Sequence, residues 1–161
     1  MKIDIRAWAE GVGVVAVVLS LLFVGFEIRQ SSEIATVEAS QALAQMSQEL
    51  TVTTHMEPEF ASLIIKADEQ GLDSLDAIER ERYVTFVRLS FNVWEQAFYS
   101  HSRGVLTDEH WQNWNSANCD RIPARWFETL DRIGFLPEFV ELVDECYAKA
   151  KEQEEAGGRP P

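Results

Sequence analysis

The sequence lacks the patterns that identify most enzymes and metal proteins. It contains no G-x-S-x-G, H-E-x-x-H, P-loop, dinucleotide-binding or paired C-x-x-C motif. Its three histidines, His55, His101 and His110, lie in separate segments, with no second histidine at helical spacing and no Glu-x-x-His pair. We therefore expect no catalytic residues of a recognised type, no metal site and no bound cofactor.

Cysteine is also scarce, and no stretch alternates apolar and polar residues as a strand would. Cys119 and Cys146 are 27 residues apart and have no metal-ligand spacing. They could pair in an oxidising compartment, or they could be two small core residues in a cytosolic domain. Because apolar residues fall at helical spacing throughout, the sequence predicts an all-α protein.

Basic residues are few. The chain of 161 residues has 14 Lys and Arg against 27 Asp and Glu, which gives a net charge of −13. Residues 1–54 carry −3 and residues 55–161 carry −10. This balance argues against nucleic acid as a partner and against a domain that lies flat on anionic lipid.

What the sequence does contain is one long uncharged run, residues 11–26, bracketed by Glu10 and Glu27. Sixteen residues cover roughly 24 Å, and extension to 7–28 reaches the ~20 residues that cross a bilayer. With Trp8 suited to the lipid interface, we predict an N-terminal tail at 1–6 and a transmembrane helix at 7–28. A buried helix of a soluble protein is one alternative. A cleaved signal is another, although residues 24–28 make a poor cleavage site.

Small residues line one face of this predicted span. Ala9, Gly13, Ala16 and Ser20 follow helical spacing, and one heptad further the row reaches Glu27. Close backbone approach along such a row drives association between helices in lipid, so we predict a contact with another transmembrane helix. That helix would belong to a partner protein or to a second copy. Alternatively, the row reflects the general frequency of Gly and Ala in membrane helices.

The charges that flank the run favour one orientation. Lys2 and Arg6 precede it, Arg29 follows it closely, and the next basic residue is Lys66. By the positive-inside rule, this places the N-terminus in the cytoplasm and the following domain outside.

The next segment, 29–54, has no proline or glycine and is predicted to continue the helix as a juxtamembrane element. Its apolar and small residues at three- to four-residue spacing predict a narrow packing stripe: Ala35, Ala39, Leu43, Met46 and Leu50. We expect this stripe to dock on its own domain, and the alternative is another helix.

The remainder, 55–155, is predicted to be an acidic α-helical domain, with a disordered tail at 156–161. Proline and glycine positions predict helices at 58–70, at 74–103 with Asp73 as N-cap, and from Thr107. A loop is expected at 113–120, followed by helices at 123–133 and from 136. The polar residues from 151 onward are also expected to be disordered.

One set of polar residues could line a pocket. Arg88 and Glu95 are seven residues apart on a predicted helix and share a face, and His101 and Trp111 could join them. The alternative is that these charges are solvated or paired.

Several segments together resemble a widespread proteobacterial family. They are VVAVVLSLLFVGFEIRQSS at 14–32, Trp94, GVLTDEHWQNW at 104–114, ARWFE and PEFVELVDE at 137–145. The resemblance implies a single-span protein of the bacterial inner membrane with a helical domain and no established activity. Relatives carry more Lys and Arg after the span, which implies a cytoplasmic domain, so the side of the domain stays open.

From these features we expect a membrane-anchored interaction protein in contact with the lipid bilayer and other transmembrane helices. It would be an accessory or scaffold subunit of a membrane complex, or a self-associating oligomer. The alternatives are an enzyme whose pocket is not recognised and a single-span sensor that transmits through the long helix.

Overall fold

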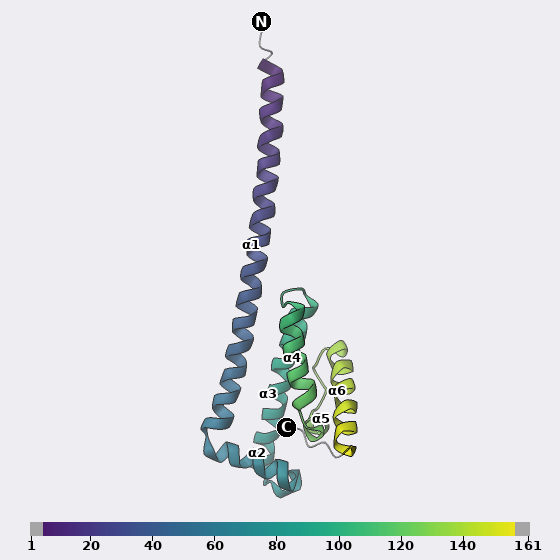
Figure 1. Ribbon diagram of the computed structural model, residues 1–161. Coiled ribbons are helices and arrows are strands. Elements are labelled where there is room, and N and C mark those ends of the chain that lie inside the picture. Colours follow the sequence, from purple (N-terminus) through teal and green to yellow (C-terminus); the bar gives the residue numbers. More distant parts are fainter. Residues whose placement is uncertain (1–4, 157–161) are drawn as a thin grey trace. The chain divides into compact units, whose positions relative to one another are not determined.

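The computed structural model describes residues 5–156, with side chains at 13–52 and 57–156. Over this range the chain is all-helical, as predicted, with one 3-10 turn and no strand (Figure 1). By its contacts the chain divides into two units, Met1–Glu38 and Ala39–Pro161. The elements are α1 (Ile5–Met56), α2 (Pro58–Gln70), η1 (Leu72–Ser74), α3 (Ala77–Ser102), α4 (Asp108–Arg121), α5 (Ala124–Thr129) and α6 (Pro137–Glu155).

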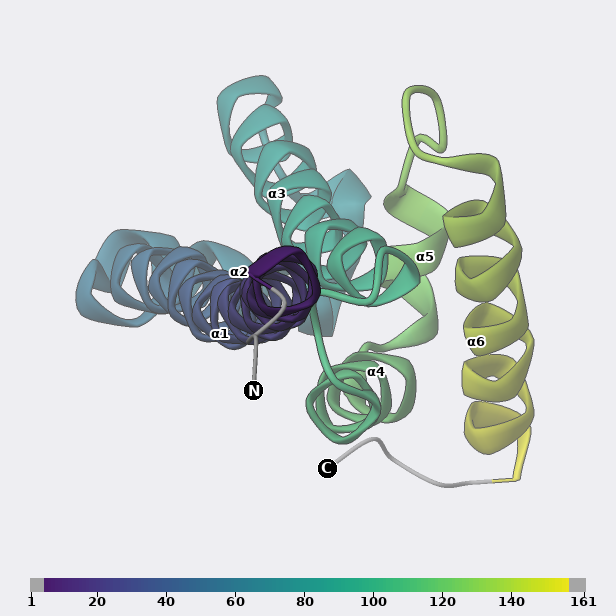
Figure 2. The same cartoon turned by 90° about the horizontal axis from the view of Figure 1, so that it is seen from above.

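The second unit is built around α3. Helices α2, α4 and α5 pack against α3, and α6 lies along α4 and α5 (Figure 2). One face of α3 is completely buried because its apolar residues recur every three to four positions. Those residues are Tyr83, Val87, Phe91, Trp94 and Ala97.

Aromatic rings join this face to the later helices. Trp94 meets Phe139 of α6 edge to face with 5.4 Å between ring centroids, and Phe91 meets Phe127 of α5 in the same way at 5.4 Å. Edge-to-face pairs add stabilisation to the burial of apolar area. The larger buried cluster therefore contains no residue of α1, and Leu43 of α1 belongs to a second, smaller cluster with Ala97 and Leu106.

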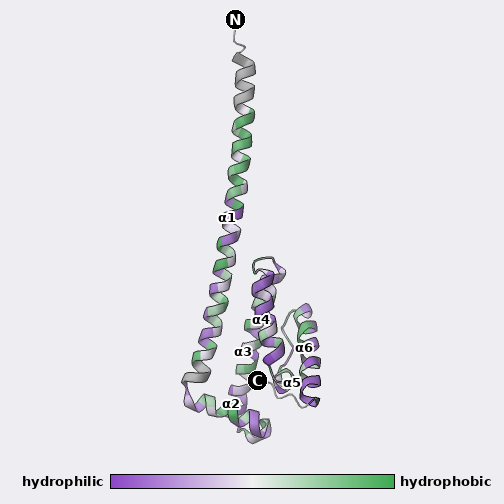
Figure 3. Ribbon diagram, viewed as in Figure 1, coloured by the Kyte–Doolittle hydropathy of each residue, from purple (hydrophilic) through white to green (hydrophobic). Residues whose placement is uncertain are grey.

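The first unit is the N-terminal part of α1, where the apolar run is exposed. Its large side chains from Val14 to Phe26 have 48–68% of their surface exposed, and Figure 3 shows the hydrophobic colour concentrated there. Within Gly13–Val52 the helix is long and apolar enough to cross a membrane, and its most apolar window is not buried at all. A signal sequence passes the same test of length and composition, and so does a soluble core helix.

The start of α3 corrects one prediction. Asp73 is not the N-cap, because it lies in η1; α3 begins at Ala77, three residues after the predicted start at 74, and its N-cap is Asp76. The Asp76 carboxylate accepts hydrogen bonds from the backbone N–H groups of Ile78 and Glu79, both at 2.8 Å, and Glu79 accepts from the Asp76 N–H at 2.9 Å. This reciprocal capping box satisfies first-turn donors that Asp73 is too distant to reach.

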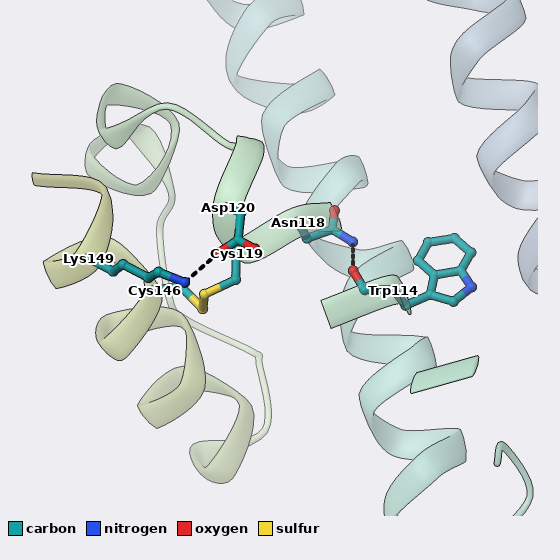
Figure 4. Close-up of a disulfide and its surroundings, with 6 residues drawn as sticks. All are labelled: Trp114, Asn118, Cys119, Asp120, Cys146 and Lys149. Atoms are coloured by element: carbon teal, nitrogen blue, oxygen red, sulfur yellow. Dashed lines mark hydrogen bonds and ion pairs between the residues drawn. A yellow bond between two sulfur atoms is a disulfide. The ribbon is translucent and has the colours of Figure 1, made fainter. Parts of the chain in front are cut away.

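The loop predicted at 113–120 is wrong, because α4 continues to Arg121. Its weak helix formers are supported by side-chain and tertiary contacts: Asn118 donates to the Trp114 carbonyl at 2.7 Å, and a disulfide joins Cys119 to Cys146 of α6 (Figure 4). Tertiary support of this kind overrides intrinsic propensity.

Two helix ends also differ from the prediction. Helix α5 ends at Thr129, because Arg132 donates to the carbonyls of Phe127 and Leu130 and holds the chain in a turn. Helix α6 extends through Glu155, so residues 151–155 are helical and not disordered. The rest of the predicted tail, from residue 157, lies outside the described residues.

We predict that Asp76→Ala lowers the free energy of unfolding by about 1 kcal/mol, because two N–H groups of α3 lose their acceptor. Asp73→Ala is the matched control, since Asp73 is exposed in η1. Urea unfolding monitored by circular dichroism measures both. Equal losses for the two variants would contradict the assignment of the cap.

Candidate binding groove

The four residues predicted to line a pocket are used in two separate structural contacts. Arg88 and Glu95 both hold the segment between α5 and α6. The Arg88 Nη2 donates to the Ile133 carbonyl at 2.8 Å, and Glu95 Oε1 accepts from the Leu136 N–H at 2.6 Å. Gly134 in this segment has φ of 91°, and a Cβ there would lie 3.4 Å from Arg88 Nη2.

His101 and Trp111 meet at the turn between α3 and α4. Their rings are stacked with 5.3 Å between centroids and 14° between planes, and His101 Nε2 lies 2.9 Å from Asp108 Oδ1. Over the described residues, the structure therefore gives each of the four side chains a local packing or hydrogen-bonding partner. No group of three or more potential metal ligands occurs there.

The residues predicted for membrane contact lie on α1. Gly13, Ala16, Ser20 and Glu27 are exposed, and Ser20 donates its hydroxyl to the Ala16 carbonyl at 2.8 Å. A Cβ added to Gly13 would meet nothing within 4 Å. Ala9 lies outside the described side chains.

The predicted juxtamembrane stripe is only partly covered by the domain. Leu43 is 3% exposed and packs against Ala97 of α3 and Leu106 after it. Ala39 and Leu50 are half-buried, whereas Ala35 and Met46 are exposed. One residue, Leu43, therefore anchors this part of α1.

Beside that anchor, an open apolar groove of about 710 Å³ lies between α1 and α3. Its apolar lining comes from two residues of α1, one of α2 and three of α3. These are Met46, Leu50, Phe60, Phe86, Leu89 and Val93. Its polar lining is Glu49, Glu81, Arg82, Thr85, Asn92 and Gln96.

The groove is long because it follows α3 from Glu81 to Gln96. The lining positions of α3 recur every three to four residues between Glu81 and Gln96, a rise of about 22 Å. Leu89 and Met46 are 45% and 42% exposed. The second face of α3 is thus an apolar row that the chain covers incompletely.

Charge on the groove is unevenly distributed. Glu49 and Glu81 lie along it, and Arg82, the only cation among the described residues of the lining, has its guanidinium 5.3 Å from the centroid of the Phe60 ring. Cation–π contact of this kind engages the guanidinium within the domain. Among the described residues, the lining of the groove therefore carries two carboxylates and one guanidinium.

Charged and polar side chains join α2 to α3 and α5. Lys66 of α2 bonds Glu79 of α3 at 2.6 Å, and this hydrogen bond, with that from the Asp76 N–H, lowers the pKa of Glu79. The Tyr83 hydroxyl and the Arg125 Nε both donate to Asp68 Oδ1, at 3.1 and 2.7 Å. Burial and the nearby Asp68 raise the pKa of Tyr83, which therefore stays a neutral donor.

Sequence reasoning missed the groove because it needs α1 beside α3. The signal present in the sequence was Phe86, Leu89 and Val93, which recur at helical spacing beside the buried row of α3.

In comparisons with known proteins, no family model, curated protein or solved structure matches the chain.

We predict that Glu95→Ala lowers the free energy of unfolding by about 1–2 kcal/mol, because the Leu136 N–H at the start of α6 loses its charged acceptor. Glu81→Ala, an exposed carboxylate on the same helix, should change it by less than about 0.5 kcal/mol. Thermal and urea unfolding compare the two variants. A Glu95 variant as stable as the Glu81 variant would show that this contact contributes nothing to stability.

Proposed function

We propose that this protein is a membrane-anchored interaction protein whose apolar run spans the bilayer. The observation that carries the proposal is the exposure of that run: its large side chains from Val14 to Phe26 are about half to two-thirds exposed. Contiguous apolar surface of this size is unfavourable in water and marks contact with lipid or protein. A bilayer covers such a helix on all sides, because its backbone bonds are already satisfied internally.

The helical domain is the binding part of this proposal. Its aromatic core is engaged in packing, whereas the groove leaves an apolar surface only partly covered. This combination supports a subunit that binds another protein, as an accessory or scaffold in a bacterial membrane complex or as a self-associating oligomer. The predicted small-residue face of the span would supply a second contact within the lipid.

The test is purification of the full chain from native membranes in mild detergent, comparing Gly13→Leu with Gly25→Leu. Added carbons at either glycine meet nothing within 4 Å in the chain itself, so an effect reports on a partner. The two positions lie about 120° apart around the helix, and both variants add the same apolar volume. We expect Gly13→Leu to reduce co-purification of the partner, or self-association, at least fivefold, and Gly25→Leu to leave it within twofold.

Two results would overturn the proposal. Recovery of the wild-type chain in the soluble fraction, with the apolar run missing from its intact mass, would show a cleaved signal. A wild-type chain that stays in the membrane as a monomer without any partner would remove the interaction role. An equal effect of the two leucine variants would contradict only the predicted contact through the small-residue face.

A further inference from the structure

We propose that the groove between α1 and α3 binds a basic amphipathic helix of a partner protein. This deepens the proposed interaction role by naming the surface and the chemistry of its ligand. The surface is the apolar row Phe86, Leu89 and Val93 of α3, faced by Met46 and Leu50 of α1 and closed at one end by Phe60 of α2.

The shape of the groove favours a helix. The apolar row rises about 10 Å along α3, and polar lining residues extend the groove to about 22 Å between Glu81 and Gln96. Lining residues at each turn match the ridge that a second helix presents at three- to four-residue spacing. Apolar anchors at such spacing are the usual way in which an amphipathic helix occupies a groove. A compact small molecule would occupy only part of this length.

The charge along the groove favours a basic ligand. Glu49 and Glu81 stand beside the apolar row and outnumber Arg82, whose guanidinium keeps its positive charge while it lies over the Phe60 ring. Residues 55–161 carry a net charge of −10, so the whole domain attracts a basic segment and repels an acidic one. An anionic lipid headgroup would meet the same two carboxylates, which argues against a lipid in the groove.

The test uses the full chain in nanodiscs of uncharged phosphatidylcholine and a labelled 18-residue peptide with Leu at helical spacing and Lys elsewhere. Fluorescence anisotropy, corrected with empty nanodiscs, gives the dissociation constant. We expect Leu89→Lys to weaken binding at least tenfold, because it places a cation in the apolar row. Ile133→Lys makes the same charge change at a side chain that is 76% exposed on a segment outside the groove lining, and should leave binding within twofold.

Three results would overturn the proposal. Equal weakening by Leu89→Lys and Ile133→Lys would show only general attraction to an acidic domain. Equal binding of the same peptide with Glu in place of Lys would remove the basic character of the ligand. A wild-type dimer that Leu89→Lys converts to a monomer would assign the groove to a second copy. Each of these leaves the membrane anchor and its own test untouched.

A second, independent inference concerns the side of the membrane. We infer that the helical domain lies in an oxidising compartment, outside the cytoplasm. Cys119 of α4 and Cys146 of α6 form a disulfide with their Cα atoms 5.0 Å apart, and Cys146 is only 1% exposed (Figure 4). Protein disulfides persist in oxidising compartments and are rare in the cytosol.

The flanking charges support the same side. Lys2 and Arg6 precede the apolar run, whereas only Arg29 follows it closely. When the bond forms, the two thiols lose two protons and two electrons, and a disulfide-carrying oxidant of that compartment is reduced to its dithiol. The bond joins two helices that also pack against each other, α4 and α6.

The test traps thiols in intact cells with N-ethylmaleimide, denatures the protein, and then adds a polyethylene glycol maleimide with or without prior reduction. We expect two mass tags after reduction and none without it. No tag in either sample, or equal tagging with and without reduction, would mean that the thiols were free in the cell and would overturn the inference. In spheroplasts, a membrane-impermeant maleimide should label Gln112→Cys, an exposed position on α4, and failure to label it would also overturn the inference.

Discussion

The burial of one face of α3 is the constraint on which the rest of the domain depends. Tyr83, Val87, Phe91 and Trp94 are fully buried, and burial of each such side chain stabilises the fold by roughly 1.5–3 kcal/mol. Helices α2, α4 and α5 pack against this helix, and α6 packs on α4 and α5 and meets α3 through Phe139. The opposite side of α3 is therefore left to α1, which covers it only in part, and the groove follows directly from that division.

The sequence correctly predicted those helix ends that are set by a proline, a glycine or a capping residue within one turn. Pro58 and Gly71 bracket α2, and Thr107 caps α4 by accepting the His110 N–H, because each acts within one turn of its own position. The prediction of Asp73 as the N-cap of α3 was wrong because both Asp73 and Asp76 precede the same apolar pattern. Only the 3-10 turn at Leu72–Ser74 brings the second into register with the first turn of α3.

Features that depend on contacts between distant segments were beyond such reasoning. The continuation of α4 through 113–120 requires its packing and disulfide with α6, which no local pattern contains. The polar residues Arg88 and Glu95 do share a face, as their spacing indicates. Their partners, however, are backbone groups of the 133–136 segment, 45 and 41 residues away, which the sequence pattern does not reveal. The groove was missed for the same reason, since one side of it, with Met46, Glu49 and Leu50, belongs to α1.

The disulfide also determines how the chain would respond to a cut. Cys119 and Cys146 close a covalent loop that contains α5 and the turn stabilised by Arg132. Proteases favour irregular segments such as 130–136, and cleavage there would normally free the C-terminal helix. Here the disulfide would keep the two fragments covalently linked. A cleaved molecule would therefore keep α6 against the rest of the domain, and the fragments would separate only after the disulfide was reduced.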